Sequence, residues 1–125
     1  MRVLLDTSVL IAFFDSSDEH HERALAALDS SSDTFEISVI SFMEMLDWPA
    51  RKSVREVDRV KKILRDFASA IHPVDEEIAA LAAMARGKSR AADALISATA
   101  SVCGATLWTL DQSLAKAHKG ALLLK

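Results

Sequence analysis

The 125-residue chain has few of the residues and runs that mark several protein classes. Cys103 is its single cysteine, so no intrachain disulfide can form and a disulfide-stapled fold is excluded. Only three glycines and two prolines argue against a disordered or collagen-like chain. No apolar run approaches the ~20 residues of a membrane span, and no secretory signal opens the sequence. We therefore expect a soluble, cytoplasmic protein.

The residues that are present are those of a compact globular chain, because half are hydrophobic and 26% are charged. A chain of this size buries roughly two-thirds of the surface that its unfolded form exposes. We expect one domain spanning residues 1–125. The formal net charge of −3 argues against a plainly basic surface for nucleic acid.

Hydrophobic patterning predicts strands that alternate with helices. The expected strands are Arg2–Leu5, Phe35–Ser38, Ala70–Val74, Thr106–Leu110 and Ala121–Leu124. The expected helices are Thr7–Phe14, Asp18–Leu28, Val39–Leu46, Ser53–Phe67, Asp75–Arg86, Arg90–Val102 and Asp111–Ala117. Trp48–Pro49 is expected to disturb or end the helix that starts at Val39. The alternation predicts an α/β fold, with a central parallel sheet of about five strands, helices on both faces, and ligands at the carboxyl ends of the strands.

Four of the 18 acidic residues stand in apolar surroundings, whereas most others lie beside charges or at helix starts. Asp6 ends the first expected strand in VLLDTSVLIAFF, and Asp111 ends the fourth in TLWTLDQS. Glu44 lies between two methionines in VISFMEML, and Asp93 lies in the small, apolar helix AADALISATA. Two of the four therefore fall at strand ends, where a parallel sheet places its site.

Each of these acids alone has a simpler explanation, since Asp6 and Asp111 could be helix N-caps and Asp93 could cap from a first turn. Together they need positive charge, because a buried carboxylate is costly without a partner. Their segments offer almost none, and only Arg90 is close to Asp93. Clustered carboxylate oxygens suit Mg²⁺ or Mn²⁺, and one or two such ions can activate water for attack on a phosphodiester.

The sequence resembles the PIN-domain nucleases and, within them, the VapC-type toxins of bacterial and archaeal toxin–antitoxin pairs. The resemblance rests on four segments in the family's order and spacing, namely LLDTSVLIAFF, ISFMEM, RAADALISATA and LWTLDQSL. It implies that the catalytic and metal-binding acids are Asp6, Glu44, Asp93 and Asp111. We call these four residues the candidate carboxylates.

The same resemblance implies supporting hydroxyl groups at Thr7 or Ser8 and at Thr109. The chain departs from the family after its fourth expected strand, where members often have a second acid or an Asn–Asp pair. Ser113 and Leu114 occupy those places here, so the fourth carboxylate depends on Asp111 alone.

The resemblance also implies an activity and its partners. The expected activity is a Mg²⁺- or Mn²⁺-dependent endoribonuclease that leaves a 5′-phosphate and a 3′-hydroxyl. The expected partners are an RNA substrate, a second copy in a homodimer, and an antitoxin that places a basic side chain among the candidate carboxylates. The amphipathic segments Thr7–Leu28 and Ser53–Phe67 are expected to form the groove for an antitoxin helix.

Two other readings remain open for a chain of this family: an RNA-processing nuclease without an antitoxin, and an inactive module that binds RNA or protein. A haloacid-dehalogenase-type phosphatase needs a second Asp at the position of Ser8, and a receiver domain needs a Lys after a late strand.

The basic residues between Arg51 and Arg65 are expected to form a solvated helix face. Without the candidate carboxylates, 14 acidic residues face 15 basic ones, so a metal-filled site would meet RNA without strong repulsion.

Overall fold

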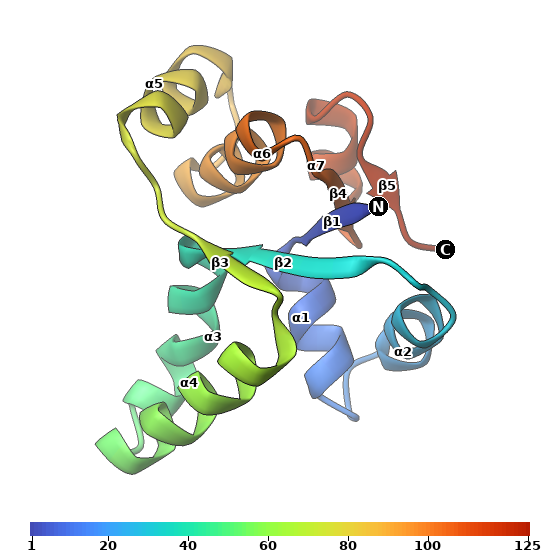
Figure 1. Cartoon of the computed structure of the whole chain (residues 1–125), viewed down its shortest axis with the longest axis vertical. Coiled ribbons are helices and arrows are strands. Elements are labelled where there is room, and N and C mark those ends of the chain that lie inside the picture. Colours follow the sequence, from blue (N-terminus) through green and yellow to red (C-terminus); the bar gives the residue numbers. More distant parts are fainter.

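The computed structural model describes residues 1–125 and contains one five-stranded sheet (Figure 1). The strands are β1 (Arg2–Leu5), β2 (Thr34–Ser38), β3 (Ala70–His72), β4 (Thr106–Thr109) and β5 (Leu122–Leu123). The helices are α1 (Thr7–Phe14), α2 (His21–Asp29), α3 (Val39–Ala50), α4 (Val54–Phe67), α5 (Glu76–Ala85), α6 (Ala91–Cys103) and α7 (Gln112–Ala117). The strand order is β3-β2-β1-β4-β5, and every neighbouring pair is parallel. The predicted α/β fold with a parallel sheet is confirmed.

Helices cover both faces of this sheet, with α1 and α2 below the strands and α5 and α6 above them in Figure 1. Val3 and Leu5 of β1 are fully buried in the core cluster that includes Leu28 of α2. Leu4 points to the opposite face and packs with Ile96 of α6. Successive strand residues face opposite sides, so a continuously apolar β1 is what a strand buried on both faces requires. None of the helices combines the length and the apolar character of a membrane span.

Two predicted helix boundaries are wrong. Helix α2 starts at His21 rather than Asp18, because the Asp18 carboxylate accepts a hydrogen bond from the His20 N–H in a turn before the helix (2.8 Å). Helix α3 continues to Ala50 instead of ending near Leu46. Pro49 lies in its last turn and is buried, so packing of its ring offsets the one backbone hydrogen bond that proline cannot donate.

A fifth acid, Glu36, is as buried as Asp6, although the sequence pattern does not single it out. Arg2 donates to both of its oxygens, at 2.7 and 2.9 Å, and its Oε1 also lies 2.5 Å from Nε2 of His72. The other nitrogen of His72 contacts the Cys103 thiol. The hydrogen bonds from Arg2, supported by those with His72, lower the Glu36 pKa from 4.5 to about 2 despite its burial. Glu36 therefore ties β1, β2 and β3 together and is neutralised within the fold.

Glu36 is expected to make the protein sensitive to acid. Its pKa is lower in the folded state than in the unfolded state, so its contribution is present above pH 4.5 and is lost as the pH falls toward about 2. At about 1.4 kcal/mol per pKa unit, the contribution is roughly 3 kcal/mol. Urea unfolding from pH 7 to pH 2 should show that loss in the native chain.

The matched comparison is Glu36→Gln against Glu77→Gln, a change of an exposed acid in the first turn of α5. Glu36→Gln should be less stable at pH 7 and less dependent on pH between 4.5 and 2. Equal behaviour of the two variants would contradict the proposed effect of Glu36.

Candidate metal centre

The site is built around Asp6, which follows β1 and is the N-cap of α1. Its backbone N–H donates to the carbonyl of Trp108 in β4, at 3.0 Å. Its Oδ1 accepts from the Thr7 N–H at 2.8 Å, and its Oδ2 accepts from the Ser8 and Thr109 hydroxyl groups at 2.7 and 2.8 Å. No cation contacts this carboxylate, which is 4% exposed.

Burial raises the pKa of Asp6, the hydrogen bonds from Ser8 and Thr109 lower it, and the charge of Asp93 raises it further. Three short hydrogen bonds thus hold a carboxylate in place without neutralising it. An extra positive charge at this position would be strongly stabilised.

Thr7 connects Asp6 to Glu44. Its backbone N–H binds Asp6, and its hydroxyl group donates to Oε1 of Glu44 at 2.6 Å while lying 2.9 Å from the Ser41 hydroxyl. Glu44 lies in α3, which begins directly after β2, and is partly buried. The second candidate carboxylate is therefore positioned from a neighbouring strand.

A second hydroxyl, that of Thr109, connects Asp6 to Asp111. It donates to Asp6 and accepts from the backbone N–H of Asp111 at 2.9 Å. Asp111 is the N-cap of α7, and its Oδ1 accepts from the N–H groups of Ser113 and Leu114 at 2.8 and 3.3 Å. Asp111 and Asp93 also line one open hollow of about 260 Å³.

Asp6 and Asp111 are helix N-caps, as the simpler explanation of these two acids predicts. Capping uses one lone pair of a carboxylate oxygen and leaves others free to bind a cation. It also fixes each side chain at a strand end beside the switch between β1 and β4, where open α/β sheets bind ligands. The two roles are compatible in this geometry.

Arg90 is the cation that pairs directly with one of these acids. Its Nε and Nη2 donate to the two oxygens of Asp93, both at 3.2 Å. The hydrogen bonds and charge of Asp93 raise its pKa, and the charges of Glu44 and Asp111 contribute as well. Sequence proximity links Arg90 to Asp93 alone, whereas the fold brings it into the field of three candidate carboxylates.

The chemistry of the donor set suits a hard divalent cation. All four acids offer carboxylate oxygens, which Mg²⁺ and Mn²⁺ prefer. In the present arrangement, however, no three His, Cys, Asp or Glu side chains are placed to hold one ion. Each carboxylate is instead engaged by a local donor, such as Thr7 at Glu44 and Arg90 at Asp93. The donor types fit a metal. The side chains of Glu44 and Asp93 would have to move for the four carboxylates to bind one ion.

Two polar residues of the hollow, Lys88 and Ser89, have no distinctive sequence signal. They lie in the turn between α5 and α6, a short stretch that reads as an ordinary loop. Only the turn of the chain into α6 brings them beside Asp93 and Asp111.

Comparison with known proteins gives a consistent result. The PIN domain model matches residues 3–120. The structure of FitAcB from Neisseria gonorrhoeae is 28% identical, with a TM-score of 0.76 over 97% of this chain and 96% of that one. FitAB bound to an IR36 DNA fragment is 30% identical, with a TM-score of 0.73 over 97% and 93% of the two chains.

A toxin–antitoxin complex from Klebsiella pneumoniae is 28% identical, with a TM-score of 0.77 over 96% of this chain and 95% of that one. A search of curated protein sequences found no match. Because the family model spans nearly the whole chain and the sheet carries its acids at the carboxyl edge, the chain belongs to the PIN domain family.

Proposed function

We propose that this chain is a metal-dependent endoribonuclease that acts as the toxin of a toxin–antitoxin pair, with residues 1–125 forming a single nuclease domain. The observation that carries the proposal is Asp6, a buried carboxylate that three hydrogen bonds orient and no cation neutralises. Thr7, through its backbone N–H and its hydroxyl, connects Asp6 to Glu44, and the Thr109 hydroxyl connects Asp6 to Asp111. Family membership supports phosphodiester hydrolysis as the use of this arrangement.

The candidate carboxylates would hold Mg²⁺ or Mn²⁺, which supplies activation of water and stabilisation of charge on the phosphate when bound. Ser8 and Thr109 keep the Asp6 carboxylate in one orientation, so this side chain needs no reorganisation when substrate arrives. In the proposed reaction the water oxygen bonds to phosphorus and the bond to the 3′ oxygen breaks. The 3′ oxygen takes up a proton, leaving a 5′-phosphate and a 3′-hydroxyl.

RNA is the proposed substrate because the surface outside the site does not repel a phosphate backbone. Beyond the candidate carboxylates, the chain has 15 basic against 14 acidic residues. Lys88 and Arg90 line the hollow beside Asp93 and Asp111, where a backbone phosphate would lie. An RNA-processing nuclease without an antitoxin uses the same chemistry, and expression in a host cell separates the two.

An antitoxin is the proposed partner of a groove of about 430 Å³ formed by α1, α3 and α4. Exposed apolar side chains line it, including Ile11 at 44% exposure, Trp48 at 64% and Ile63 at 37%. The groove extends to Glu44, so a helix lying in it could carry a basic side chain to the site. The sequence predicts a groove formed by the segments Thr7–Leu28 and Ser53–Phe67. Of the helices in these segments, α1 and α4 line the groove and α2 does not. Helix α3, which lies outside both segments, lines it as well. A solved neighbour that is a toxin–antitoxin complex supports this partner.

Cleavage of structured RNA by the purified chain, freed of any partner, tests the main proposal. Activity should require Mg²⁺ or Mn²⁺ and stop in EDTA. Asp6→Asn and Asp93→Asn should each lower the rate more than about 100-fold, since each removes a direct ligand. Asp111→Asn should leave roughly a tenth of the activity, because it acts through water and Asn keeps the cap.

Single-turnover rates on one labelled RNA provide this comparison, and melting temperatures confirm that each variant is folded. Cleavage that continues in chelator would overturn the metal mechanism. An Asp111→Asn variant as inactive as Asp6→Asn would overturn the ranking of the acids.

Arg90→Gln is expected to strengthen metal binding. The change removes a positive charge that pairs with Asp93 and interacts with the charges of Glu44 and Asp111, so a divalent cation meets less repulsion and Asp93 is released. The dissociation constant for Mn²⁺, measured by calorimetry without RNA, should fall roughly tenfold. Lys62→Gln is the control, because Lys62 pairs with Asp66 on exposed α4 and lines neither the groove nor the hollow. Unchanged Mn²⁺ affinity in Arg90→Gln would show that Arg90 does not compete with the metal.

Co-expression with the product of the neighbouring upstream gene tests the antitoxin. The complex should purify intact and lack RNase activity, whereas the isolated chain should be toxic and run as a homodimer in size exclusion with light scattering. Trp48→Glu should prevent association, because it places a charge in the groove. Met84→Glu, a change of an exposed apolar residue on α5, is the control. Full activity of the complex, or a harmless isolated chain, would favour the RNA-processing nuclease.

A further inference from the structure

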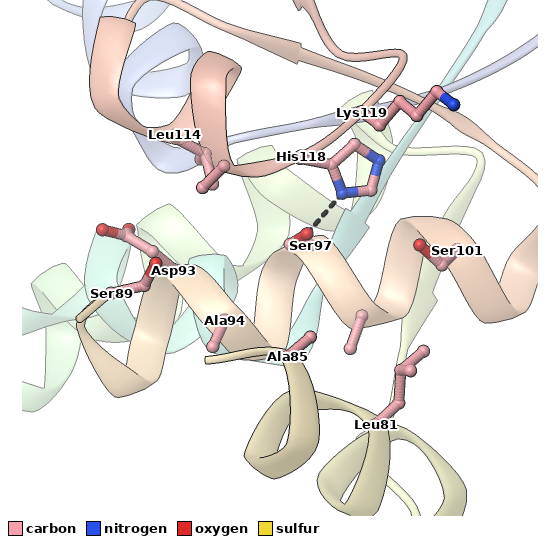
Figure 2. A pocket seen from close by; sticks show the side chains of 12 residues that line it. Leu81, Ala85, Ser89, Asp93, Ala94, Ser97, Ser101, Leu114, His118 and Lys119 are labelled. Atoms are coloured by element: carbon pink, nitrogen blue, oxygen red, sulfur yellow. Dashed lines mark hydrogen bonds between the residues drawn. The ribbon is translucent and has the colours of Figure 1, made fainter. Parts of the chain in front are cut away.

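A cavity of about 220 Å³ lies beside the candidate metal centre, between α5, α6 and the α7–β5 connection (Figure 2). It shares Ser89, Asp93 and Leu114 with the hollow that contains Asp111 and Arg90. The two spaces therefore lie next to each other at the start of α6. A strand whose phosphate lies at Asp93 would place a neighbouring nucleotide at this cavity.

The lining of the cavity combines an apolar floor with a polar edge. The floor consists of small or aliphatic side chains, among them Leu81, Ala94 and Leu114, and its volume suits a planar ring rather than a single water molecule. Ser97 and His118 form the edge, and Figure 2 shows their hydrogen bond between the Ser97 hydroxyl and Nδ1 of His118. Apolar walls with a few fixed polar groups are typical of ligand sites.

His118 is held in an orientation and a charge state in which it can hydrogen-bond to a ligand in the cavity. Burial lowers its pKa, which keeps the imidazole neutral near pH 7. Ser97 occupies Nδ1 and fixes the ring, while Nε2 has no hydrogen-bond partner and remains accessible to solvent. A neutral, oriented imidazole presents one donor or one acceptor, according to the tautomer that the Ser97 bond selects.

Cations lie at the two outer ends of the cavity and the neighbouring hollow. Lys119 lies beside His118 at one end, and Lys88 and Arg90 line the hollow at the other. In Figure 2, Lys119 extends away from the apolar floor and Asp93 lies at the far end of the cavity. This spacing places positive charge on either side of the apolar cavity, as a base flanked by two backbone phosphates requires.

We propose that the cavity lined by Ser97 and His118 is a nucleobase subsite, which selects the base next to the cleaved phosphodiester of a single-stranded RNA segment. The proposal rests on the proposed nuclease function for its place beside the scissile bond. Sequence-specific RNA recognition commonly works in this way, by taking an unstacked base into a pocket and bonding its edge. His118 and Ser97 determine specificity here and take no part in the chemistry at the candidate carboxylates.

Binding without cleavage gives the direct test. Fluorescence anisotropy in EDTA would measure the affinity of the isolated chain for short labelled homopolymers of A, C, G and U. The native chain should prefer one base, and Ser97→Ala and His118→Gln should each weaken binding of that homopolymer roughly tenfold and remove the preference. Lys119→Gln should weaken all four about equally and reduce the salt dependence, because Lys119 meets phosphate only. Ser30→Ala, a change of an exposed residue at the end of α2, should alter nothing.

Sequencing of cleavage sites in Mg²⁺ provides the second measurement. The native chain should show one enriched base beside the cut bond, and His118→Gln should lose that enrichment while still cleaving. If His118→Gln does not fold, as melting would show, Ser97→Ala and the exposed Lys119→Gln decide the question.

The remaining outcomes separate the two proposals. A native chain without base preference, or variants that keep it, would overturn the subsite. Variants that bind RNA normally but lose the antitoxin would overturn it in favour of a protein contact. Base preference that depends on His118 in a chain that never cleaves RNA would support the subsite and overturn the nuclease function.

Discussion

The carboxylate of Asp6 is buried at the end of the central strand without a cation, and the arrangement around it depends on this constraint. Removing such a charge from water costs several kcal/mol unless other groups replace the lost hydration. The Thr7 N–H and the hydroxyl groups of Ser8 and Thr109 provide that replacement, which is why small hydroxyl residues stand at the ends of β1 and β4. The Thr7 hydroxyl also donates to Glu44, and the Thr109 hydroxyl also accepts from the Asp111 N–H, so the residues that solvate one acid position two others. The charge itself remains available to an incoming cation.

Two buried acids in one small sheet show how the surroundings separate a neutralised charge from one that no cation contacts. Glu36 lies mid-strand, where Arg2 and His72 neutralise it and lower its pKa to about 2. Asp6 lies at the strand end, where only neutral donors reach it and burial raises its pKa. Asp93 is an intermediate case, because it is paired with a cation, Arg90, that remains largely exposed. A paired but exposed cation can leave as a metal enters, which a buried arginine could not do.

Much of the fold could be predicted, because the signals for its elements are local. The bounds of β1 and α1 follow from an apolar run that gives way to an Asp N-cap, and α5 follows from Asp75 before it and Gly87 after it. The predicted start of α2 is wrong because of a local turn at Asp18, whereas other features depend on distant contacts that outweigh local preference. Pro49 remains helical because its ring is buried, and Glu36 sits in a core because Arg2 lies on the strand beside it. Arg2 and Glu36 are 34 residues apart, so their pairing leaves no local pattern in the sequence.

The sequence by itself determined the alternation of strands and helices, the parallel sheet, and four acids in apolar surroundings as candidates for a site. These features depend on residue type and periodicity, which a linear chain displays directly. Only the tertiary structure decided that the charges of Glu44 and Asp111 act on Arg90, that Thr7 and Thr109 connect the acids, and that Ser97 meets His118 beside a cavity. The physical reason is that hydrogen bonds and charge interactions act over a few ångströms in space. Pairs such as Ser97 and His118 reach that distance only after the sheet and helices have packed.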